Sequence, residues 1–517
     1  MICTVMAFLF VGLFFAHGVA RWAQFKYMLK YDDVKFTDML LHIRWVFPDK
    51  ARENFKKLGN HYHELSKEYA EEGDFKQSFY FARHGVLRAP ENLEGRLRLA
   101  GFWSILKNEE YLLATLEGGL QFTDEINDTT NGYIKLYLTS LIELQDDFKV
   151  IEYADSVLPE QPVLNLRNQM IAMFTSQAHY LRGNFDRAED YLVDYKLIET
   201  PEGRLLSAII SWERGEKKQA MDKLDAAIRR YPEDQRFYIQ ASSYCRELED
   251  YENAIKYATL RGMAEPDQPN SRVEIITALR NMDREDEAKR KTEQFFKIFS
   301  EDPKALAMLA NSGTYFGDTK LVRRIYELAL EQGFDMGEFA LYFIESCITE
   351  KDYQRAIQFS EDLENEQPAW LEDQLGVFYS LQSVAYYGAG RPDLGSLYLG
   401  KFMNHGDKPE AAKAFSVAQK YKNLGMLKQA RKTLYYAYEQ LPDNQKILSA
   451  LVELDLDLGN SQQLPQHLRK LLTMRRPPTK LLERSYEDLG SDRFIFAKNR
   501  EDLLLELEGM LNRSSRG

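Results

Sequence analysis

Cysteine is scarce in this chain: Cys3, Cys245 and Cys347 are the only three among 517 residues. An odd and sparse count of this kind provides neither a disulfide framework nor the paired spacing of a structural zinc site. Cys245 and Cys347 lie 102 residues apart, which is three times a 34-residue interval that recurs in the chain. We therefore expect both thiols to be buried as small apolar side chains between helices.

Catalytic signatures are also missing. The sequence contains no GxSxG, P-loop, HExxH or CxxC pattern, and no GxGxxG follows an expected strand. His61, His63 and Glu64 form the grouping that comes nearest to a metal site. His61 and His63 are two residues apart on an expected helix, however, so they point to different faces. We expect no metal, no cofactor and no enzymatic activity.

The chain lacks an excess of basic residues as well. It has 67 Lys and Arg against 80 Asp and Glu, a formal net charge of -13 at pH 7. An acidic chain repels phosphate backbones, which argues against nucleic acid as a partner. Hydrophobic residues make up 44% of the chain and aromatic residues 13%. This content predicts an ordered fold with a buried core rather than a disordered chain.

Charge is absent from the N-terminal segment, since residues 1–20 contain no Lys, Arg, Asp or Glu. About 20 apolar residues suffice to cross the hydrocarbon core of a membrane as a helix. Arg21 and Trp22 follow as interfacial residues. We therefore predict a single-pass transmembrane anchor over residues 1–22, with its orientation left open. The alternative is a signal segment cleaved near Ala20, which would give a secreted or periplasmic chain.

A fixed spacing dominates the middle of the chain. Five short polar segments begin 34 residues apart, at Gly215, Glu249, Asp283, Gly317 and Lys351. Five positions after each of these points stands a small or β-branched residue, followed by a helical pattern: Ala220, Ala254, Ala288, Val322 and Ala356. A constant period of this length is typical of a helical-repeat array.

The repeats resemble tetratricopeptide (TPR) repeats, which are pairs of antiparallel helices. Residues 411–444 carry the best match to that family, through Val417, Ala418, Tyr421, Gly425, Leu427, Ala430, Leu434, Ala437 and Pro442. The small residues let two helices approach closely, and Gly or a polar residue ends the first helix, where a positive φ is often required. Proline near the end of each unit stops the second helix. The resemblance covers roughly residues 59–478.

The resemblance implies an all-α fold, an α-solenoid of about twelve TPR-like helix pairs. We expect the array over residues 59–478, preceded by a lead-in helical region over residues 23–58 and followed by a capping helix and tail over residues 479–517. The lead-in region carries an apolar stripe before Pro48, made of Phe36, Leu40, Leu41, Ile43 and Trp45. A solenoid requires such closing elements at its ends.

In this family the concave inner face is built from set positions of each first helix. Those positions give a candidate partner-binding groove with basic, amide and aromatic side chains: Arg246, Arg280, Asn270, Asn311, Tyr315 and Tyr342. Such a patch suits an extended peptide or an acidic segment. The alternative is that these residues are merely solvated, with Arg246 and Arg280 paired to Glu247 or Glu274.

Chaperone-binding members of the family hold a dicarboxylate through Lys and Asn at fixed positions. This chain has Asn311 at one of them, but Ala307 and Tyr342 stand at two others. We therefore expect no docking of chaperone tails. The sequence predicts a membrane-anchored scaffold or adaptor that binds protein partners through its groove and organises an assembly at the membrane. The alternative is a secreted or periplasmic TPR protein that binds a cell-surface polymer or glycan.

Overall fold

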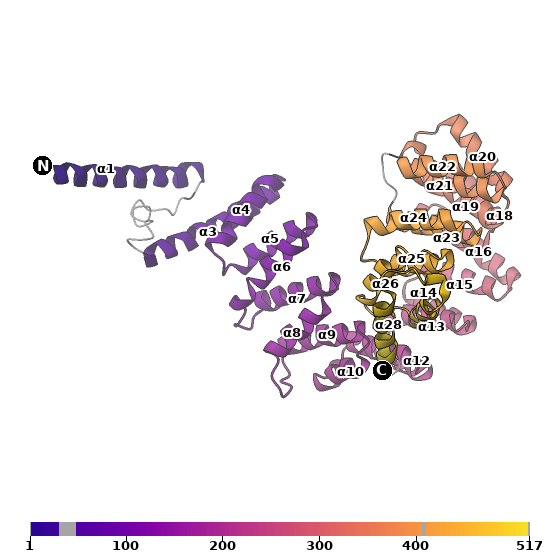
Figure 1. The fold of residues 1–517 in the computed structure, drawn as a ribbon, viewed down its shortest axis with the longest axis horizontal. Coiled ribbons are helices and arrows are strands. Elements are labelled where there is room, and N and C mark those ends of the chain that lie inside the picture. The colour runs from indigo at the N-terminus through magenta and orange to yellow at the C-terminus, as the bar shows by residue number, and fades with distance from the viewer. Residues whose placement is uncertain (1, 30, 32–47, 406–409, 515–517) are drawn as a thin grey trace. The chain divides into compact units, whose positions relative to one another are not determined.

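The computed structural model describes residues 2–29, 31, 48–405 and 410–514 (Figure 1). Over these ranges the regular elements are all helices, with no strand. The described chain divides into two compact units. Unit 1 contains residues 1–179 and 190–196, and unit 2 contains residues 180–189 and 197–517. The expected apolar stripe from Phe36 to Trp45 lies outside the described residues.

Unit 1 begins with one long helix and continues as helix pairs. Its elements are α1 (Ile2–Ala23), the short π-helix η1 (Gln24–Met28), α3 (Pro48–Glu71), α4 (Phe75–Arg88), α5 (Leu93–Ile105), α6 (Glu109–Glu117), the 3-10 turn η2 (Leu120–Phe122), α7 (Asp128–Glu143) and α8 (Asp147–Val157). Two further helices, α9 (Leu166–Leu181) and α10 (Phe185–Asp194), are divided between the two units. Tyr133, Leu138 and Leu141 of α7 are fully buried in the core of unit 1.

The apolar N-terminal segment forms α1, but it does not meet the requirement for a membrane span. Within the described ranges no helix is both long enough and apolar enough to cross a membrane. The prediction of a single-pass anchor over residues 1–22, and of a membrane location based on it, is therefore wrong.

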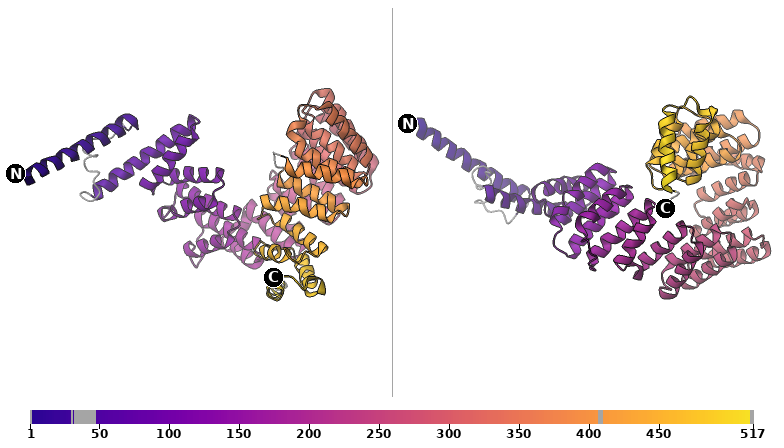
Figure 2. Two further views of the ribbon diagram at one scale, coloured as in Figure 1. Left: turned by 45° about the horizontal axis from the view of Figure 1, so that its top comes forward. Right: turned by 60° about the horizontal axis from the view of Figure 1, so that its bottom comes forward.

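Unit 2 is a longer series of helix pairs, seen from two further directions in Figure 2. After the 3-10 turn η3 (Leu197–Glu199) come α11 (Pro201–Glu213), α12 (Lys217–Arg230), α13 (Gln235–Glu247), α14 (Tyr251–Ala264), α15 (Asn270–Asn281), α16 (Glu285–Phe299), α17 (Pro303–Phe316), α18 (Thr319–Gln332), α19 (Gly337–Thr349) and α20 (Tyr353–Glu366). The series continues with α21 (Leu371–Gly388), α22 (Pro392–Asn404), α23 (Ala411–Asn423), α24 (Leu427–Gln440), α25 (Gln445–Leu458), α26 (Leu464–Leu472), α27 (Thr479–Gly490), the 3-10 turn η4 (Asp492–Phe494) and α28 (Arg500–Ser514).

The helices of unit 2 pack in the order that a solenoid requires. We call the odd-numbered helices from α11 to α27 the first helices and their even-numbered partners the second helices. Each first helix contacts its own second helix, and second helices such as α14, α18 and α20 also contact the first helix that follows. First helices contact one another along the series, as in α15, α17, α19, α21 and α23. The first helices from α15 to α23 therefore form one continuous face, in a TPR-like α-solenoid.

The turn inside each pair explains the 34-residue spacing. All five residues that mark the spacing have positive φ: 84° at Gly215, 57° at Glu249, 56° at Asp283, 66° at Gly317 and 66° at Lys351. One left-handed residue ends the first helix and reverses the chain. An aspartate then caps the second helix at several of these turns, as where the Asp318 carboxylate accepts a hydrogen bond from the Leu321 amide at 3.0 Å.

The small residues five positions further on are buried, as their spacing predicts. The exposed fraction of each is 2% or less, at Ala220, Ala254, Ala288, Val322 and Ala356. Cys245 and Cys347 are also buried free thiols, so the expectation of small apolar packing residues is confirmed. Burial raises the pKa of each thiol to about 11, which keeps both protonated at neutral pH.

A buried polar cluster joins three helices near the end of unit 2. The Asp455 carboxylate of α25 is fully buried and accepts hydrogen bonds from Arg431 Nε of α24 at 2.6 Å and Asn460 Nδ2 at 2.8 Å. His467 Nδ1 of α26 lies 2.6 Å from the same carboxylate. Both oxygens of Asp455 are satisfied, as a buried charge requires.

The C-terminal helix α28 packs on the end of unit 2. Its Leu503 and Leu507 are fully buried in a core shared with α25, α26 and α27.

Candidate partner-binding pocket

Three successive first helices of unit 2 enclose a pocket of about 460 Å³. Its walls come from α19, α21 and α23 and from the residues just before α19 and α21. Apolar and aromatic side chains line one part of it: Leu341, Tyr342, Trp370, Val377, Leu381 and Val417. Charged side chains line another part of it: Asp335, Glu338, Glu345, Asp373, Lys413 and Lys420. A cavity of this size and mixed lining falls within the range of protein ligand sites.

The unequal lengths of the helices explain why the cavity forms here. α21 has 18 residues, whereas α19 and α23 have 13 each. The extra length lies at the start of α21, where Trp370 is the N-cap residue and Asp373, Gln374 and Val377 face the pocket. Trp370 packs over Gly337, because a Cβ built at Gly337 would lie 3.3 Å from the indole ring. Glycine at this point leaves room for the tryptophan.

The polar groups of the pocket are partly connected to one another. Lys420 of α23 forms an ion pair with Glu345 of α19, and their side chains are 19% and 25% exposed. The Tyr342 hydroxyl donates a hydrogen bond to Glu338 Oε1 at 2.9 Å. Burial raises the pKa of the Tyr342 phenol, and the negative charges of Glu338 and Glu345 add to the effect. Asp373 makes no side-chain hydrogen bond or ion pair with any described residue.

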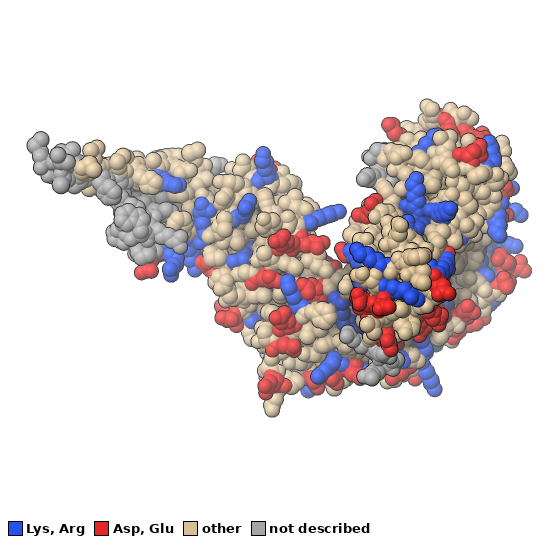
Figure 3. All heavy atoms as spheres, in the orientation of Figure 1, with Lys and Arg blue, Asp and Glu red and all other residues tan. Residues whose placement is uncertain are grey.

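The pocket carries more negative than positive charge. Four carboxylates line it, from Asp335, Glu338, Glu345 and Asp373, against the two ammonium groups of Lys413 and Lys420. On the face shown in Figure 3, by contrast, acidic and basic side chains are interspersed over the surface. Because Lys420 is already paired with Glu345, three carboxylates face the single remaining cation, Lys413. The local electrostatic potential of the pocket is therefore negative.

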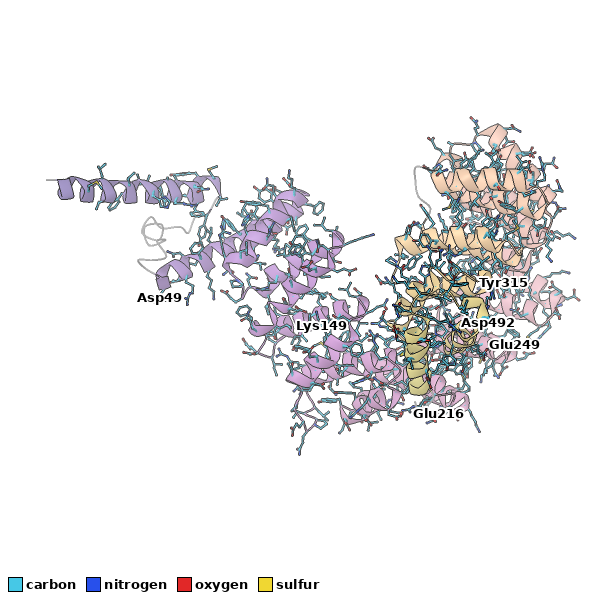
Figure 4. The ribbon with its side chains drawn as sticks, in the orientation of Figure 1. Asp49, Lys149, Glu216, Glu249, Tyr315 and Asp492 are labelled. Carbon is cyan, nitrogen blue, oxygen red and sulfur yellow. The ribbon has the colours of Figure 1, made fainter. Side chains whose placement is uncertain are left out.

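The six residues predicted for the groove do not meet in one place. Tyr342 lines the pocket, and it is the one member of the predicted set that does. Tyr315 of α17, labelled in Figure 4, is 73% exposed, and Asn311 on the same helix is also exposed. Asn270 is the first residue of α15 and is half-buried.

The two predicted arginines have different environments. The guanidinium of Arg280 donates to Asp318 Oδ2 at 2.5 Å and lies 5.6 Å from the centre of the Phe316 ring, and its side chain is 8% exposed. Its acidic partner is thus neither Glu247 nor Glu274. Arg246 is half-buried and forms no ion pair with a described residue. Of the two arginines, Arg246 is therefore the one whose guanidinium is not already paired with a carboxylate.

Glu247 and Glu274 have other contacts. The Trp212 indole Nε1 donates to Glu247 Oε1 at 3.3 Å, and Lys217 Nζ lies 3.5 Å from the same oxygen. Trp212 stacks on Tyr244 with ring centres 3.7 Å apart. Glu274 pairs with Arg261 at 3.1 Å. These contacts join α11 to α13 and α14 to α15, so they stabilise the array.

The two histidines considered for a metal site lie apart in unit 1. His61 Nε2 is 2.7 Å from the Leu29 carbonyl oxygen, and its ring stacks on Tyr31. His63 is buried beside Gly85 and Gly95, where a Cβ built on Gly95 would overlap the imidazole. Among the described residues no group of three His, Cys, Asp or Glu side chains is placed to hold a metal ion.

The groove predicted from the sequence does not include the charged pocket residues, although the sequence places two of them at groove positions. Glu338, Leu341, Tyr342 and Glu345 occupy the same positions of the 337–370 unit that were used to select the groove residues. The groove hypothesis rests on basic, amide and aromatic side chains at these positions, so it does not include the two glutamates. Asp373 could not be assigned in this way, because extra residues around Trp370 interrupt the 34-residue register.

Comparison with known proteins gives distant structural likenesses. No protein-family profile and no curated protein sequence matches the chain. Among solved structures, Naa15/Naa10 bound to HypK-THB has a TM-score of 0.34 at 15% identity, over 92% of this chain and 79% of that one. Yeast Tom70 has a TM-score of 0.32 at 11% identity, over 92% and 93%. A tetratricopeptide repeat protein from Parabacteroides merdae has a TM-score of 0.30 at 13% identity, over 55% and 98%. Likenesses at this level indicate no function.

Proposed function

We propose that this chain is a non-enzymatic adaptor that binds segments of other proteins through the first helices of unit 2. The observation that supports this proposal most directly is the pocket between α19, α21 and α23. Repeat solenoids present extended surfaces to partners and rarely contain a reaction centre. The pocket combines apolar walls, two aromatic rings and a few charged groups, which is the usual composition of a site that recognises a peptide side chain.

A site-specific crosslinking experiment tests the proposal. Ser416 is exposed on α23 and lines the pocket, so a photo-reactive benzoylphenylalanine at this position would react with anything bound there. Gln358 is exposed on the second helix α20, on the opposite side of a helix pair, and gives a matched control. The full chain with either substitution is irradiated in cells that express it, and the products are identified by mass spectrometry.

We expect protein adducts from position 416 that are absent or much weaker from position 358. A second substitution, Ser416→Trp, fills the mouth of the pocket and should remove binding of the same proteins, measured by affinity capture of the full chain. Equal adducts from both positions, or none from position 416, would contradict the proposal.

A further inference from the structure

The charge and shape of the pocket between α19, α21 and α23 determine which class of ligand it can bind. Three carboxylates, from Asp335, Glu338 and Asp373, are not neutralised by Lys420, because Lys420 is paired with Glu345. Lys413 is exposed and supplies one opposing charge. This excess negative charge would repel an anionic ligand, whereas it would attract a cationic ligand and be neutralised by it.

The aromatic and apolar walls favour the same kind of ligand. Trp370 and Tyr342 place two π-systems in the lining, and the face of an aromatic ring attracts a guanidinium or ammonium group. Leu341, Val377 and Leu381 provide an apolar wall for the methylene stem that connects such a group to a peptide backbone. An arginine or lysine side chain matches both parts of the pocket at once.

We propose that this pocket binds an arginine or lysine side chain within an extended, basic segment of a partner protein. The inference rests on the proposed adaptor function and adds the chemical class of the partner. It reverses the sequence-based hypothesis, in which Arg246 and Arg280 hold an acidic segment. The cationic head group lies between Asp335, Glu338 and Asp373, and the flanking peptide follows the face of α19, α21 and α23.

The inference is tested by selecting peptides on the full-length protein. A random dodecapeptide library displayed on phage is panned against the immobilised chain, and the selected peptides are synthesised with a fluorescent label. Binding is measured by fluorescence anisotropy to the wild type and to Asp335→Asn/Asp373→Asn, which removes two charges and preserves side-chain shape. A matched control, Asp286→Asn/Asp362→Asn, removes two exposed carboxylates from the second helices α16 and α20.

We expect selected peptides to be enriched in arginine and lysine. Their dissociation constants should rise on the order of tenfold for the pocket variant and change little for the control. Raising the salt concentration should weaken binding to the wild type, since part of the attraction is screened. Replacing the basic residue of a selected peptide by glutamine should cause a comparable loss.

Three outcomes would overturn the inference. Enrichment of neutral or acidic peptides that Ser416→Trp excludes would show a peptide-binding pocket without the proposed charge preference, and the adaptor function would stand. Equal binding of selected peptides and of free spermine would show a site for small polyamines instead of a protein segment. Absence of any selected peptide would contradict both the inference and the proposed function.

Discussion

Lys420 and Glu345 form an ion pair between α23 and α19, two first helices separated by a complete helix pair. In a solenoid each unit normally contacts its immediate neighbours alone. A side-chain contact between next-nearest units therefore requires strong curvature at α19, α21 and α23, and this curvature draws the walls of the pocket together. The ion pair closes one side of the pocket and holds a cation against one of its carboxylates.

Removing one member of this pair should destabilise the curved segment. Glu345→Gln leaves the Lys420 ammonium group largely buried without its counter-charge, at a cost of about 2 kcal/mol, between the values for exposed and buried pairs. The double variant Glu345→Gln/Lys420→Gln should recover part of that loss, which a double-mutant cycle from urea unfolding would measure.

The pair Arg323–Glu327 provides the control, because its side chains are 66% and 55% exposed within α18. Glu327→Gln should lower the free energy of unfolding by at most about 0.5 kcal/mol. Equal effects of Glu345→Gln and Glu327→Gln would show that the ion pair of the pocket has no special structural role.

A side chain at the turn residue Gly215 should lower stability, because its φ lies further into the positive range than that of the side-chain-bearing equivalents Glu249, Asp283 and Lys351. Its φ of 84° lies in the left-handed region, and a Cβ there would meet no atom within 4 Å, so backbone strain is the main effect of a substitution. Gly215→Ala should lower the free energy of unfolding by about 1–2 kcal/mol.

Gly400 provides the control. It lies inside α22, it also has no atom within 4 Å of a built Cβ, and its φ is not positive. Gly400→Ala should raise stability by up to about 1 kcal/mol. Thermal or urea unfolding of both variants would show opposite shifts.

The repeat could be predicted from the sequence because it depends on local chemistry. The 34-residue interval from Gly215 to Lys351 arises because each helix pair needs one left-handed turn residue. The small residue at Ala220 and its equivalents recurs because the helices of each pair pack closely there. Both requirements act within one unit and recur unchanged. A period in the sequence therefore contains enough information to define the helix pairs.

The pocket could not be predicted in the same way because it depends on three units at once. Its residues extend from Asp335 to Lys420, and the extra residues around Trp370 shift the register between them. The pairing of Arg280 with Asp318 depends on the contact between two neighbouring units, and that of Lys420 with Glu345 on curvature over three units, and no single unit encodes either.

Charge reversal at the two predicted groove arginines should have unequal effects. Arg280→Glu places a second carboxylate beside Asp318 in a site that is 8% exposed, so we expect a loss of about 3–4 kcal/mol in the free energy of unfolding. Arg246→Glu affects a side chain without an ion pair and should change stability by less than about 0.5 kcal/mol. Circular dichroism during urea unfolding distinguishes the two. A stable Arg280→Glu protein would contradict the structural role of the Arg280–Asp318 pair.

The buried imidazole of His63 should make the stability of unit 1 depend on pH. Burial lowers the pKa of His63 from 6.5 to about 4, and the positive charges of Arg98 and Arg96 act in the same direction. Between these two pKa values the unfolded chain binds more protons than the folded chain. The free energy of unfolding therefore falls as the pH falls, and the loss is largest below the folded pKa.

The expected loss between pH 7 and pH 5 is about 2 kcal/mol, from the part of the titration that lies in this interval. His63→Phe keeps an aromatic ring beside Gly85 and Gly95 but cannot be protonated, so its stability should decrease less over the same interval. His61→Phe is the matched control, since His61 stacks on Tyr31 at a half-buried site. Urea midpoints of the three proteins at both pH values give the comparison. An equal pH dependence of the wild type and His63→Phe would show that His63 is not the group responsible.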